Sequence, residues 1–367
     1  MTIAQTARPL TQPREGNRIR VAILGATGYV GAELVRVLSR HPAVTIVALA
    51  ARNRENLAIG DPYPHLASSE LRIEAELPDT AGLDAVFIAL PHGQAAGVVP
   101  QLIAAGTRVI DMGPDFRLGD PAAYPAWYAF DHPSPELLPG AVEDSPTTAV
   151  YGLPELHRDQ LRSARLIASP GCYPTATLLA LAPLARDGLI GELVVDAKSG
   201  VSGAGREAKL ESLFGEINES VRAYGLGGHR HLPEMQQELR ALGTDAGAVE
   251  GMLFVPHLMP MTRGLMATCH VRPTRPVSSD DLAALYRAAY LDEPFVEVAA
   301  EAPATKSVTG SNRARVFPSL DARSGRIVAI GVIDNLVKGA AGQAIQSFNL
   351  AVGLPETTGL EQLALYP

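Results

Sequence analysis

The chain has 367 residues, of which 47% are hydrophobic and 19% are charged, and its mean hydropathy is +0.09. This length is enough for two domains, and the composition is that of an ordinary globular protein. The net charge of −8 at pH 7 argues against nucleic acid as a partner, and the lack of an apolar run of roughly 18–20 residues argues against a membrane protein.

The first segment of the chain, residues 1–17, lacks the long apolar stretch of a signal peptide. We expect it to form a flexible N-terminal tail. The two cysteines of the chain, Cys172 and Cys269, are too few for a disulfide framework. Their number favours a reduced, cytoplasmic setting.

Alternating strand and helix patterns begin at Arg18. Strand patterns cover residues 20–26, 44–51, 84–90 and 107–113, and helical patterns cover residues 31–40 and 95–106. Strands separated by helices of this length predict βαβ units and a parallel sheet, which is a Rossmann-type architecture. The stretch from Gly113 to about Pro154 is rich in proline and aromatic residues, and it predicts loops and short helices.

The second half of the chain has a different pattern. Strand-like runs cover residues 193–203, 251–260, 264–273, 294–300 and 326–335. Because fewer helices separate them, they predict a mixed or antiparallel sheet in a second, α+β domain. A helical pattern at 336–353 is expected to return to the first domain. The sequence therefore predicts a Rossmann domain of residues 18–167 plus 331–367 and an inserted domain of residues 168–330.

A glycine-rich turn joins the first predicted strand to the first predicted helix. Its sequence, GATGYVG, has the spacing G-x-x-G-x-x-G. Glycines let the backbone approach a pyrophosphate closely, and the amides at a helix start favour anions. The alternative is that the glycines serve only tight packing of strand against helix. We expect a dinucleotide to bind at this turn, through Gly25, Thr27, Gly28, Tyr29, Val30 and Gly31.

The residues after the second predicted strand bear on the choice of dinucleotide. NAD-binding chains usually have an acidic residue there, which holds the ribose 2′-hydroxyl. This chain has Ala51-Arg52-Asn53-Arg54 instead. Because an arginine suits a 2′-phosphate, the sequence predicts NADP(H), with Arg52 favoured over Arg54 as the contact. The alternative is that both arginines are solvated loop residues.

Cys172 stands between Pro170-Gly171 and an apolar run of helical length. A thiol at a helix start faces the positive end of the helix dipole, which favours the nucleophilic thiolate. A small buried side chain is the alternative for a lone cysteine, and it describes Cys269, inside a strand pattern, well. For Cys172 both interpretations remain open on the local residues.

A nucleophilic cysteine needs a group that moves protons, and histidine is the usual one. His229 and His231 follow a glycine-rich turn in GLGGHRHLPEM. Their i, i+2 spacing points them apart in an extended segment, so we expect one of them to reach the site. Neither C-x-x-C nor H-E-x-x-H accompanies them, and a metal site is not expected.

Two further segments carry candidate binding residues. His92, just after a strand pattern, suits a contact to the cofactor, with a helix cap as the alternative. The loop at 199–206, SGVSGAGR, contains Ser202 and Arg206 and suits an anionic substrate, with an ordinary glycine-rich hairpin as the alternative.

Taken together, these motifs resemble the N-acetyl-gamma-glutamyl-phosphate reductase family. The resemblance rests on the glycine-rich turn and on PGCYPTA, SGAGR, HRHLPE and DNLVKGAAGQA, and it includes LPHG, DFRL, YGLPEL and TKSVTGSN. It extends from about Arg18 to the C-terminus. It implies an NADP-binding Rossmann domain, an inserted α+β domain for substrate binding and oligomerisation that is shared with aspartate-semialdehyde dehydrogenases, and a homo-dimer or homo-tetramer.

The resemblance also implies roles for individual residues. Cys172 is then the nucleophile, and His231 rather than His229 is the expected acid/base. The residues expected near the substrate are Arg117, Ser202, Gly203, Arg206, His229 and Arg263. The residues expected at the cofactor, besides the glycine-rich turn and Arg52, are Pro91, His92, Gly93 and Asn335.

The implied reaction is the NADPH-dependent reduction of an acyl phosphate, N-acetyl-gamma-glutamyl phosphate, to the 5-semialdehyde and phosphate, through a cysteine thioacyl enzyme in arginine biosynthesis. One alternative is the related reductase of lysine biosynthesis, which acts on a carrier-linked aminoadipyl phosphate. The CYPTA segment favours the glutamyl version because those relatives tend to carry Asn-Ala in place of Tyr-Pro. Aspartate-semialdehyde dehydrogenase has other residues around its cysteine, and a non-catalytic NADP-binding sensor would have no use for a cysteine with a matched histidine.

Overall fold

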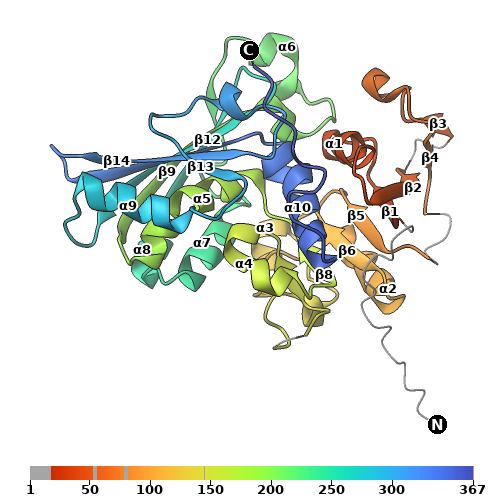
Figure 1. The fold of residues 1–367 in the computed structure, drawn as a ribbon, viewed down its shortest axis with the longest axis horizontal. Helices are drawn as coiled ribbons and strands as arrows, with labels where there is room; N and C mark the ends of the chain where they lie inside the picture. Colours follow the sequence, from red (N-terminus) through yellow and green to blue (C-terminus); the bar gives the residue numbers. More distant parts are fainter. Residues whose placement is uncertain (1–17, 53–55, 78–81, 144, 367) are drawn as a thin grey trace. The chain divides into compact units, whose positions relative to one another are not determined.

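A computed structural model describes residues 18–52, 56–77, 82–143 and 145–366. The chain divides into two compact units (Figure 1). Unit 1 comprises Met1–Tyr124, Phe130–Ser169 and Ala344–Gly359, and unit 2 comprises Pro125–Ala129, Pro170–Gln343 and Leu360–Pro367. The expected tail at 1–17, as well as Arg54, lies outside the described residues.

Unit 1 is built on an eight-stranded sheet with the order β3-β4-β2-β1-β5-β6-β8-β7. Its strands are β1 (Ile19–Leu24), β2 (Val44–Ala50), β3 (Leu57–Ala58), β4 (Arg72–Glu74), β5 (Ala85–Ile88), β6 (Arg108–Asp111), β7 (Ala149–Tyr151) and β8 (Leu166–Ala168). Neighbouring strands are parallel except for the pair β3–β4. The expected parallel sheet is confirmed, and it has four short strands (β3, β4, β7 and β8) that the sequence analysis missed because two or three residues give no readable period.

The helices of unit 1 follow the expected alternation with the strands. They are α1 (Tyr29–Leu38), α2 (Val99–Ala104), α3 (Ala123–Tyr128) and α4 (Pro154–Leu161), with the 3-10 turns η1 (Pro64–Leu66), η2 (Ala95–Gly97) and η3 (Pro135–Leu137). Helix α1 packs against β1 and β2, and α2 packs against β6. The turn between β1 and α1 therefore opens at the carboxyl end of a central strand, where ligands of such sheets bind.

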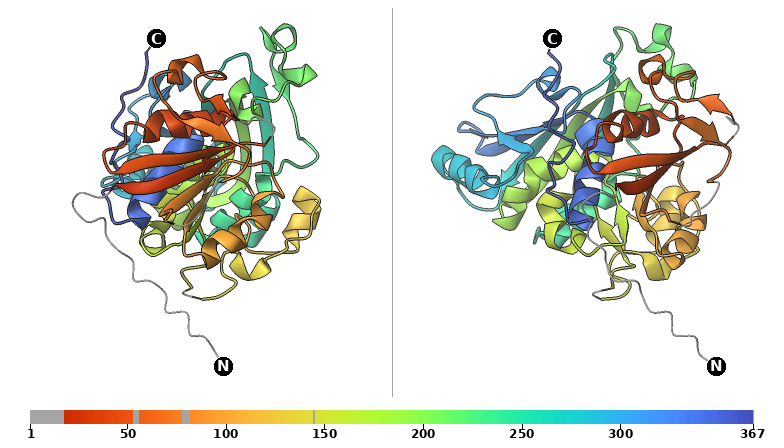
Figure 2. Two further views of the ribbon diagram at one scale, coloured as in Figure 1. Left: turned by 90° about the vertical axis from the view of Figure 1, so that its right-hand side faces the viewer. Right: turned by 45° about the vertical axis from the view of Figure 1, so that its right-hand side comes forward.

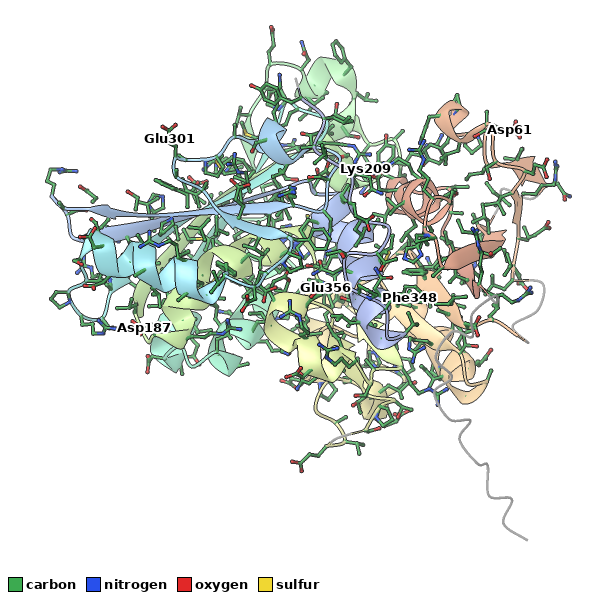
Figure 3. All side chains as sticks on the ribbon, in the orientation of Figure 1. Asp61, Asp187, Lys209, Glu301, Phe348 and Glu356 are labelled. Carbon is green, nitrogen blue, oxygen red and sulfur yellow. The ribbon has the colours of Figure 1, made fainter. Side chains whose placement is uncertain are left out.

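The last helix, α10 (Gly342–Ala351), belongs to unit 1 from Ala344 onward. The ring of Phe348, which is labelled in Figure 3, lies 5.4 Å from the ring of Phe87 on β5, measured between centroids. The Ser347 hydroxyl donates a hydrogen bond of 3.0 Å to the carbonyl of Gly152. The C-terminal helix thus completes the core of the first unit.

The boundaries between the units differ from those expected at the end of the second domain. The contacts of residues 331–343 place them in unit 2. The first three of these residues end β15 (Arg326–Ile333), which is a strand of the sheet of unit 2. Residues 125–129 also belong to unit 2, although the chain on either side of them is in unit 1. Sequence position alone gives no sign of either assignment.

Unit 2 is built on a seven-stranded mixed sheet with the order β10-β11-β9-β12-β15-β14-β13. The strands before β15 are β9 (Ile190–Gly200), β10 (Arg222–Ala223), β11 (Leu253–Met259), β12 (Leu265–Pro273), β13 (Val296–Val298) and β14 (Ala314–Asp321). The pairs β9–β11 and β13–β14 are parallel, and the other pairs are antiparallel. The expected mixed sheet is confirmed.

The longer helices of unit 2 lie on one face of this sheet (Figures 1 and 2), and α5, α8 and α9 contact its strands. They include α5 (Cys172–Arg186), α7 (Leu232–Ala241), α8 (Ala246–Glu250) and α9 (Ser279–Ala289); the other helical segments are η4 (Val201–Ala204), η5 (Leu210–Ser212), α6 (Phe214–Ile217), η6 (Thr305–Val308) and the π-helical turn η7 (Val337–Ala341). Helix α5 is apolar on all sides, which is typical of a buried helix. A Cβ at Gly331 of β15 would lie 2.2 Å from the carbonyl oxygen of Ala176 on α5, so the helix approaches the sheet closely. None of the described helices is long and apolar enough to cross a membrane.

The two faces of the sheet of unit 2 differ in burial. One lateral row, formed by Ala197, Ala267, Gly331 and Val316 on adjacent strands, is buried on the helix side. The next row, formed by Val255, Asp196, Thr268, Ile330 and Phe317, is half-exposed at every position. Because successive residues of a strand point to opposite faces, this second row lies on the face away from α5.

A buried carboxyl group ends β6 in unit 1. Asp111 is 0% exposed, and its Oδ1 accepts a hydrogen bond of 2.9 Å from the amide of Gly113. Its Oδ2 has no hydrogen-bond partner among the described residues. Burial, reinforced by the nearby charge of Asp115, raises the pKa of Asp111 to about 7.

This raised pKa predicts how stability depends on pH. The folded state keeps a proton on Asp111 up to about pH 7, whereas the unfolded chain loses it near the ordinary aspartate pKa of 3.8. This stabilising contribution is therefore lost as pH rises between these two values. The loss amounts to about 1.4 kcal/mol per pH unit for one proton. We expect Asp111→Asn to gain stability relative to the unsubstituted protein between pH 5.5 and pH 7. Urea unfolding of both proteins across this range measures the difference, and a difference that is constant with pH would contradict the prediction.

Candidate active site

Cys172 occupies the first position of α5. Its N-cap, Gly171, has extended backbone angles and provides no side-chain cap, and the Thr175 hydroxyl donates 2.9 Å to the Gly171 carbonyl. Cys172 is partly exposed, whereas Cys269 is fully buried, and burial raises the pKa of the Cys269 thiol. The expected helix start at Cys172 is confirmed, and of the two thiols it is the one that a reagent can reach.

The imidazole of His231 lies directly against the residue that precedes the cysteine. A Cβ at Gly171 would lie 2.4 Å from Nε2 of His231 and 2.7 Å from its Cε1. Only glycine leaves room for the ring at this place. On the other side of Cys172, the ring centroid of Tyr173 is 6.0 Å from that of His231. The fold of unit 2 therefore brings together a histidine and a cysteine that are far apart in sequence.

A buried carboxyl group links the two segments that carry this pair. Oε1 of Glu234 accepts a hydrogen bond of 2.8 Å from the amide of Gly171, and Glu234 is 0% exposed. Glu234 lies in the first turn of α7, whose N-cap is His231. The bond thus fixes the start of α7 against the start of α5. The sequence analysis missed Glu234 as a site residue, although it stands inside the HRHLPE motif.

His229 has a different environment from His231. Its Nδ1 accepts a hydrogen bond of 3.1 Å from the backbone amide of His231, so the neutral ring carries its proton on Nε2. Its ring also contacts the rings of Tyr173, Tyr224 and Phe254 edge-on, at centroid distances of 5.4–5.6 Å. Burial, with a smaller contribution from the neighbouring Arg230 charge, lowers the pKa of His229 to about 4. His229 is therefore uncharged at neutral pH.

Two tyrosines that the sequence analysis missed complete this cluster. The Tyr224 hydroxyl donates 3.1 Å to that of Tyr173, which in turn donates 3.1 Å to the carbonyl of His257. Burial raises the pKa of both phenols, that of Tyr224 to about 12. Both hydroxyls therefore keep their protons at neutral pH. Tyrosines next to a cysteine or before a glycine-rich loop are too common for sequence alone to single them out.

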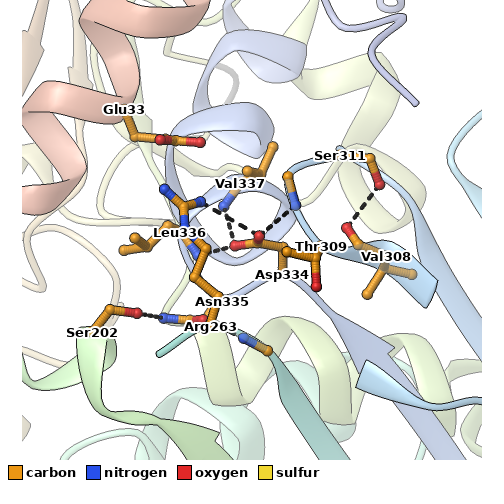
Figure 4. Close-up of polar contacts among 12 residues, drawn as sticks. Glu33, Ser202, Arg263, Val308, Thr309, Ser311, Asp334, Asn335, Leu336 and Val337 are labelled. Atoms are coloured by element: carbon orange, nitrogen blue, oxygen red, sulfur yellow. Dashed lines mark hydrogen bonds and ion pairs between the residues drawn. The ribbon is translucent and has the colours of Figure 1, made fainter. Parts of the chain in front are cut away.

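A second polar cluster of unit 2 contains three of the expected binding residues (Figure 4). Asn335 donates through Nδ2 to the Ser202 hydroxyl at 2.9 Å and accepts through Oδ1 from the Gly264 amide at 2.8 Å. Arg263 forms an ion pair of 3.4 Å with the buried carboxylate of Asp334. The carboxylate of Asp334 and the side-chain amide of Asn335 thus connect neighbouring turns of unit 2.

Asp334 also begins the turn that approaches the cysteine. Its Oδ1 accepts hydrogen bonds from the amides of Leu336 and Val337, at the start of η7. Further along this turn, a Cβ at Gly339 would lie 2.8 Å from the Cβ of Cys172. The π-helical turn, which a sequence pattern cannot distinguish from an α-helix, therefore packs against the candidate nucleophile.

The glycine-rich turn of unit 1 has the geometry of a dinucleotide cradle. Gly25 has a φ of +84°, and a Cβ there would lie 2.2 Å from the carbonyl oxygen of Ala89, while a Cβ at Gly31 would lie 2.3 Å from that of Gly25. Gly28 is the N-cap of α1 and provides no side-chain cap to its first-turn amides. The glycines thus allow tight packing, and the bare helix start also fits a pyrophosphate.

The other expected residues of unit 1 occupy two kinds of environment. Arg52, Pro91, His92 and Gly93 are exposed after the ends of β2 and β5. Asp115 holds the second of these loops by accepting hydrogen bonds from the amides of Gly93 and Ala96. Arg117 is 5% exposed, and its guanidinium donates to the backbone carbonyls of Ser169 and Met112. Its contacts support two loop backbones.

Unit 2 therefore gathers the expected residues into two clusters, with one exception. Cys172, His229 and His231 form the first cluster, and Ser202, Gly203, Arg263 and Asn335 form the second. Arg206 is exposed on the loop after η4. Within the described residues, no group of three or more His, Cys, Asp or Glu side chains stands together as a metal site.

The contact between Gly171 and His231 is testable through the chemistry of the thiol. Gly171→Ala would displace the imidazole, because its Cβ would lie 2.4 Å from Nε2. We expect iodoacetamide to alkylate Cys172 about tenfold more slowly at pH 7, the factor that one unit of thiol pKa would produce. Gly227→Ala is the matched control, since a Cβ at Gly227, two residues before His229, meets no atom within 4 Å. Equal alkylation rates in the two variants would contradict the prediction.

Two family descriptions match the chain. Residues 20–164 match "Semialdehyde dehydrogenase, NAD binding domain", and residues 172–335 match "Semialdehyde dehydrogenase, dimerisation domain". These ranges correspond to the main bodies of units 1 and 2.

Solved structures show the same fold at low sequence identity. Aspartate semialdehyde dehydrogenase II from Vibrio cholerae aligns with a TM-score of 0.67 and 20% identity, covering 92% of this chain and 99% of that one. Aspartate semialdehyde dehydrogenase with NADP from Candida albicans aligns with a TM-score of 0.64 and 15% identity, with the same coverage. At these identities the likeness concerns the fold alone.

Curated relatives are similar over nearly the whole chain. Proteins named N-acetyl-gamma-glutamyl-phosphate reductase from Heliobacterium modesticaldum and Desulforudis audaxviator are 48% and 47% identical, each over 95% of this chain and 100% of its own length. One from Dehalococcoides mccartyi is 45% identical over 95% of this chain and 99% of its own length. With this identity and coverage, the chain belongs to the N-acetyl-gamma-glutamyl-phosphate reductase family.

Proposed function

We propose that this protein reduces N-acetyl-gamma-glutamyl phosphate to N-acetylglutamate 5-semialdehyde with NADPH, releasing phosphate, as a step of arginine biosynthesis. The observation that carries the proposal is the packing of the His231 ring against Gly171, which precedes the partly exposed Cys172 at the start of α5. The names of the curated relatives support the substrate. Neither cysteine forms a disulfide, which agrees with a reducing compartment, and we place the protein in the cytoplasm.

In this mechanism Cys172 attacks the carbonyl carbon of the acyl phosphate. The positive end of α5 stabilises both the thiolate and the oxyanion that forms, and phosphate leaves as a thioester bond to the Cys172 sulfur is made. Phosphate is a far better leaving group than hydroxide, which explains why the activated acid is the substrate. The chemistry that NADPH would supply, when held at the glycine-rich turn, is a hydride for the thioester carbonyl, and Cys172 would then carry a thiohemiacetal.

His231 is the group that we assign to the proton of this thiohemiacetal. It protonates the oxygen as the negative charge develops and takes the proton back as the carbonyl re-forms and the Cys172 thiolate leaves. His229 is less suited to this task, because its Nδ1 is engaged by the His231 amide and its pKa is lowered to about 4. Its Nε2–H suits a hydrogen bond to the substrate instead.

The remaining substrate contacts are proposed from charge and position. Arg206 and Arg263 are the cations that the family resemblance implies near the substrate's anionic groups, and Ser202 and Gly203 of η4 lie beside Asn335. Arg117 is better explained as a support for the loop carbonyls that its guanidinium binds. Asn335, whose side chain bridges two turns, acts in the same supporting way.

The proposed cofactor is NADP(H) rather than NAD(H). The NAD-binding-domain match supports a nicotinamide dinucleotide, held by the backbone from Gly25 to Gly31 at the start of α1. For the 2′-phosphate we propose Arg52, which is exposed directly after β2, where an acid would favour NAD. Pro91, His92 and Gly93 follow β5, which lies on the other side of β1 from β2, and they are proposed to contact the same cofactor.

The reverse reaction tests the proposal. With N-acetylglutamate 5-semialdehyde, phosphate and NADP⁺, we expect NADPH to form only when phosphate is present, and more slowly with NAD⁺. Cys172→Ser is expected to lower kcat by at least roughly a thousandfold, because a serine hydroxyl is hardly ionised at neutral pH. The matched control is Cys269→Ser, in the buried thiol on β12, which removes no nucleophile from the site.

Three results would contradict this assignment. Turnover by Cys172→Ser at a normal rate would exclude the covalent route. Turnover of a carrier-linked aminoadipyl substrate, with none of the glutamyl semialdehyde, would move the protein to the lysine reaction. Binding of NADP⁺ without phosphate-dependent turnover of either substrate would favour a sensor.

We also propose that two copies of the chain pair through the sheet of unit 2. The matched family description names this region a dimerisation domain. The face away from α5 carries the half-exposed row Val255, Asp196, Thr268, Ile330 and Phe317, of which three residues are apolar. A partly apolar sheet face without helical cover is suited to burial against an identical face.

A charge placed in the centre of this face is expected to separate the copies. Ile330→Glu would bury an unpaired carboxylate in the interface, and light scattering should give half the mass of the unsubstituted protein. Leu291→Glu is the control, because Leu291 is 80% exposed in the turn between α9 and β13. An unchanged mass for Ile330→Glu, or a monomeric unsubstituted protein, would contradict this proposal.

A further inference from the structure

A five-residue piece of the connection between β6 and β7 belongs to unit 2. Residues 125–129, at the end of α3, have their contacts there, although the chain before and after them is part of unit 1. They include Trp127 and Tyr128, in the sequence AYPAWY of α3. The sequence analysis singled out neither residue.

Both aromatic residues contact the loop that carries the two histidines. Tyr128 is 4% exposed, and its hydroxyl donates a hydrogen bond of 3.0 Å to the carbonyl of Arg230, the residue between His229 and His231. A Cβ at Gly228 would lie 3.3 Å from Cζ3 of Trp127. The indole thus covers the glycine just before the histidines, and the phenol holds the peptide group between them.

The loop has an intrinsic need for such support. Three of the four residues before His229 are glycines, and Gly225 and Gly228 have φ values of +62° and +137°. Glycine-rich backbone loses more conformational entropy on ordering than any other, so fixing this loop is costly. The bond from the His231 amide to Nδ1 of His229 lies within the loop and does not attach it to the rest of the unit. Tyr128 attaches it from another element.

We propose that Tyr128 is a positioning residue for His231. By holding the Arg230 carbonyl, its hydroxyl fixes the peptide that leads into His231, and so keeps the imidazole against Gly171 and beside Cys172. The inference deepens the proposed function, on which it rests, because it concerns the same cysteine and histidine. After His231 in the sequence, Glu234 is fixed by its hydrogen bond to the Gly171 amide. The chain is therefore held both before and after the histidine.

A matched pair of substitutions separates positioning from simple loss of a buried hydrogen bond. Tyr124, one turn earlier in α3, is 0% exposed, and its hydroxyl pairs with the backbone of Leu118 at 3.2 Å. Tyr128→Phe and Tyr124→Phe each remove one phenol hydroxyl from the same helix. The first of these hydroxyls contacts the histidine loop, and the second contacts the backbone of Leu118.

The experiment measures two properties of the unsubstituted protein, the two tyrosine variants and His231→Gln. The first is the rate at which iodoacetamide alkylates Cys172 as a function of pH, which does not depend on the identity of the substrate. The second is kcat and KM in the phosphate-dependent reaction. Cys269 is fully buried, so the alkylation reports on Cys172.

We expect Tyr128→Phe to shift the alkylation midpoint toward that of His231→Gln and to lower kcat about tenfold, the scale of a small misplacement of a catalytic group. KM for NADP⁺ should change less than about twofold, and Tyr124→Phe should match the unsubstituted protein in both properties even if its melting temperature falls. Tyr128→Phe with an unchanged alkylation profile, or Tyr124→Phe with the same shift, would overturn the proposal. If no protein turns over the glutamyl semialdehyde, the proposed function fails, while the alkylation profiles still decide the role of Tyr128.

Discussion

The candidate site depends on the contact between two helix starts, that of α5 and that of α7. Glu234 on α7 accepts the Gly171 amide, and His231 packs on the bare Cα of Gly171. An unpaired buried carboxyl group is costly, so the hydrogen bond to Gly171 favours one relative position of the two helices. Cys172 and His231 are therefore held near each other in the folded chain, because Gly171 and Glu234 are joined by this hydrogen bond.

The same contact explains why the two histidines, although adjacent in the motif, have different chemistry. His231 lies at the helix start, where its ring faces Gly171, and the ring of His229 packs against Tyr173, Tyr224 and Phe254. Burial lowers the pKa of His229 to about 4, so its neutral ring serves as a fixed acceptor for the His231 amide over the whole physiological range. The ring of one histidine thus holds the backbone of the other.

The sequence was a good guide where a pattern repeats or where a motif is local. The parallel and mixed sheets and the start of α5 at Cys172 could be predicted from hydrophobic periods and from the Pro-Gly before the cysteine. Tyr128 could not be found in this way, because it lies 102 residues from Arg230 and its partner there is a carbonyl oxygen, which every residue has. The strand β8 that leads to Cys172 is too short, at three residues, to give a period.

The expected domain boundary at 331 differs from the contact division for a physical reason that also concerns the site. The side chains of Asp334 and Asn335 form hydrogen bonds to neighbouring turns of unit 2. The π-helical turn after them brings Gly339 against Cys172. A hydrophobic pattern reads this stretch as the start of one helix that ends in α10. The polar side chains instead hold its first part beside Cys172, and residues Ala344–Gly359 return to unit 1. Two buried polar residues, Asp334 and Asn335, therefore help to fix the turn after β15, together with its own buried apolar residues Val337 and Ala341.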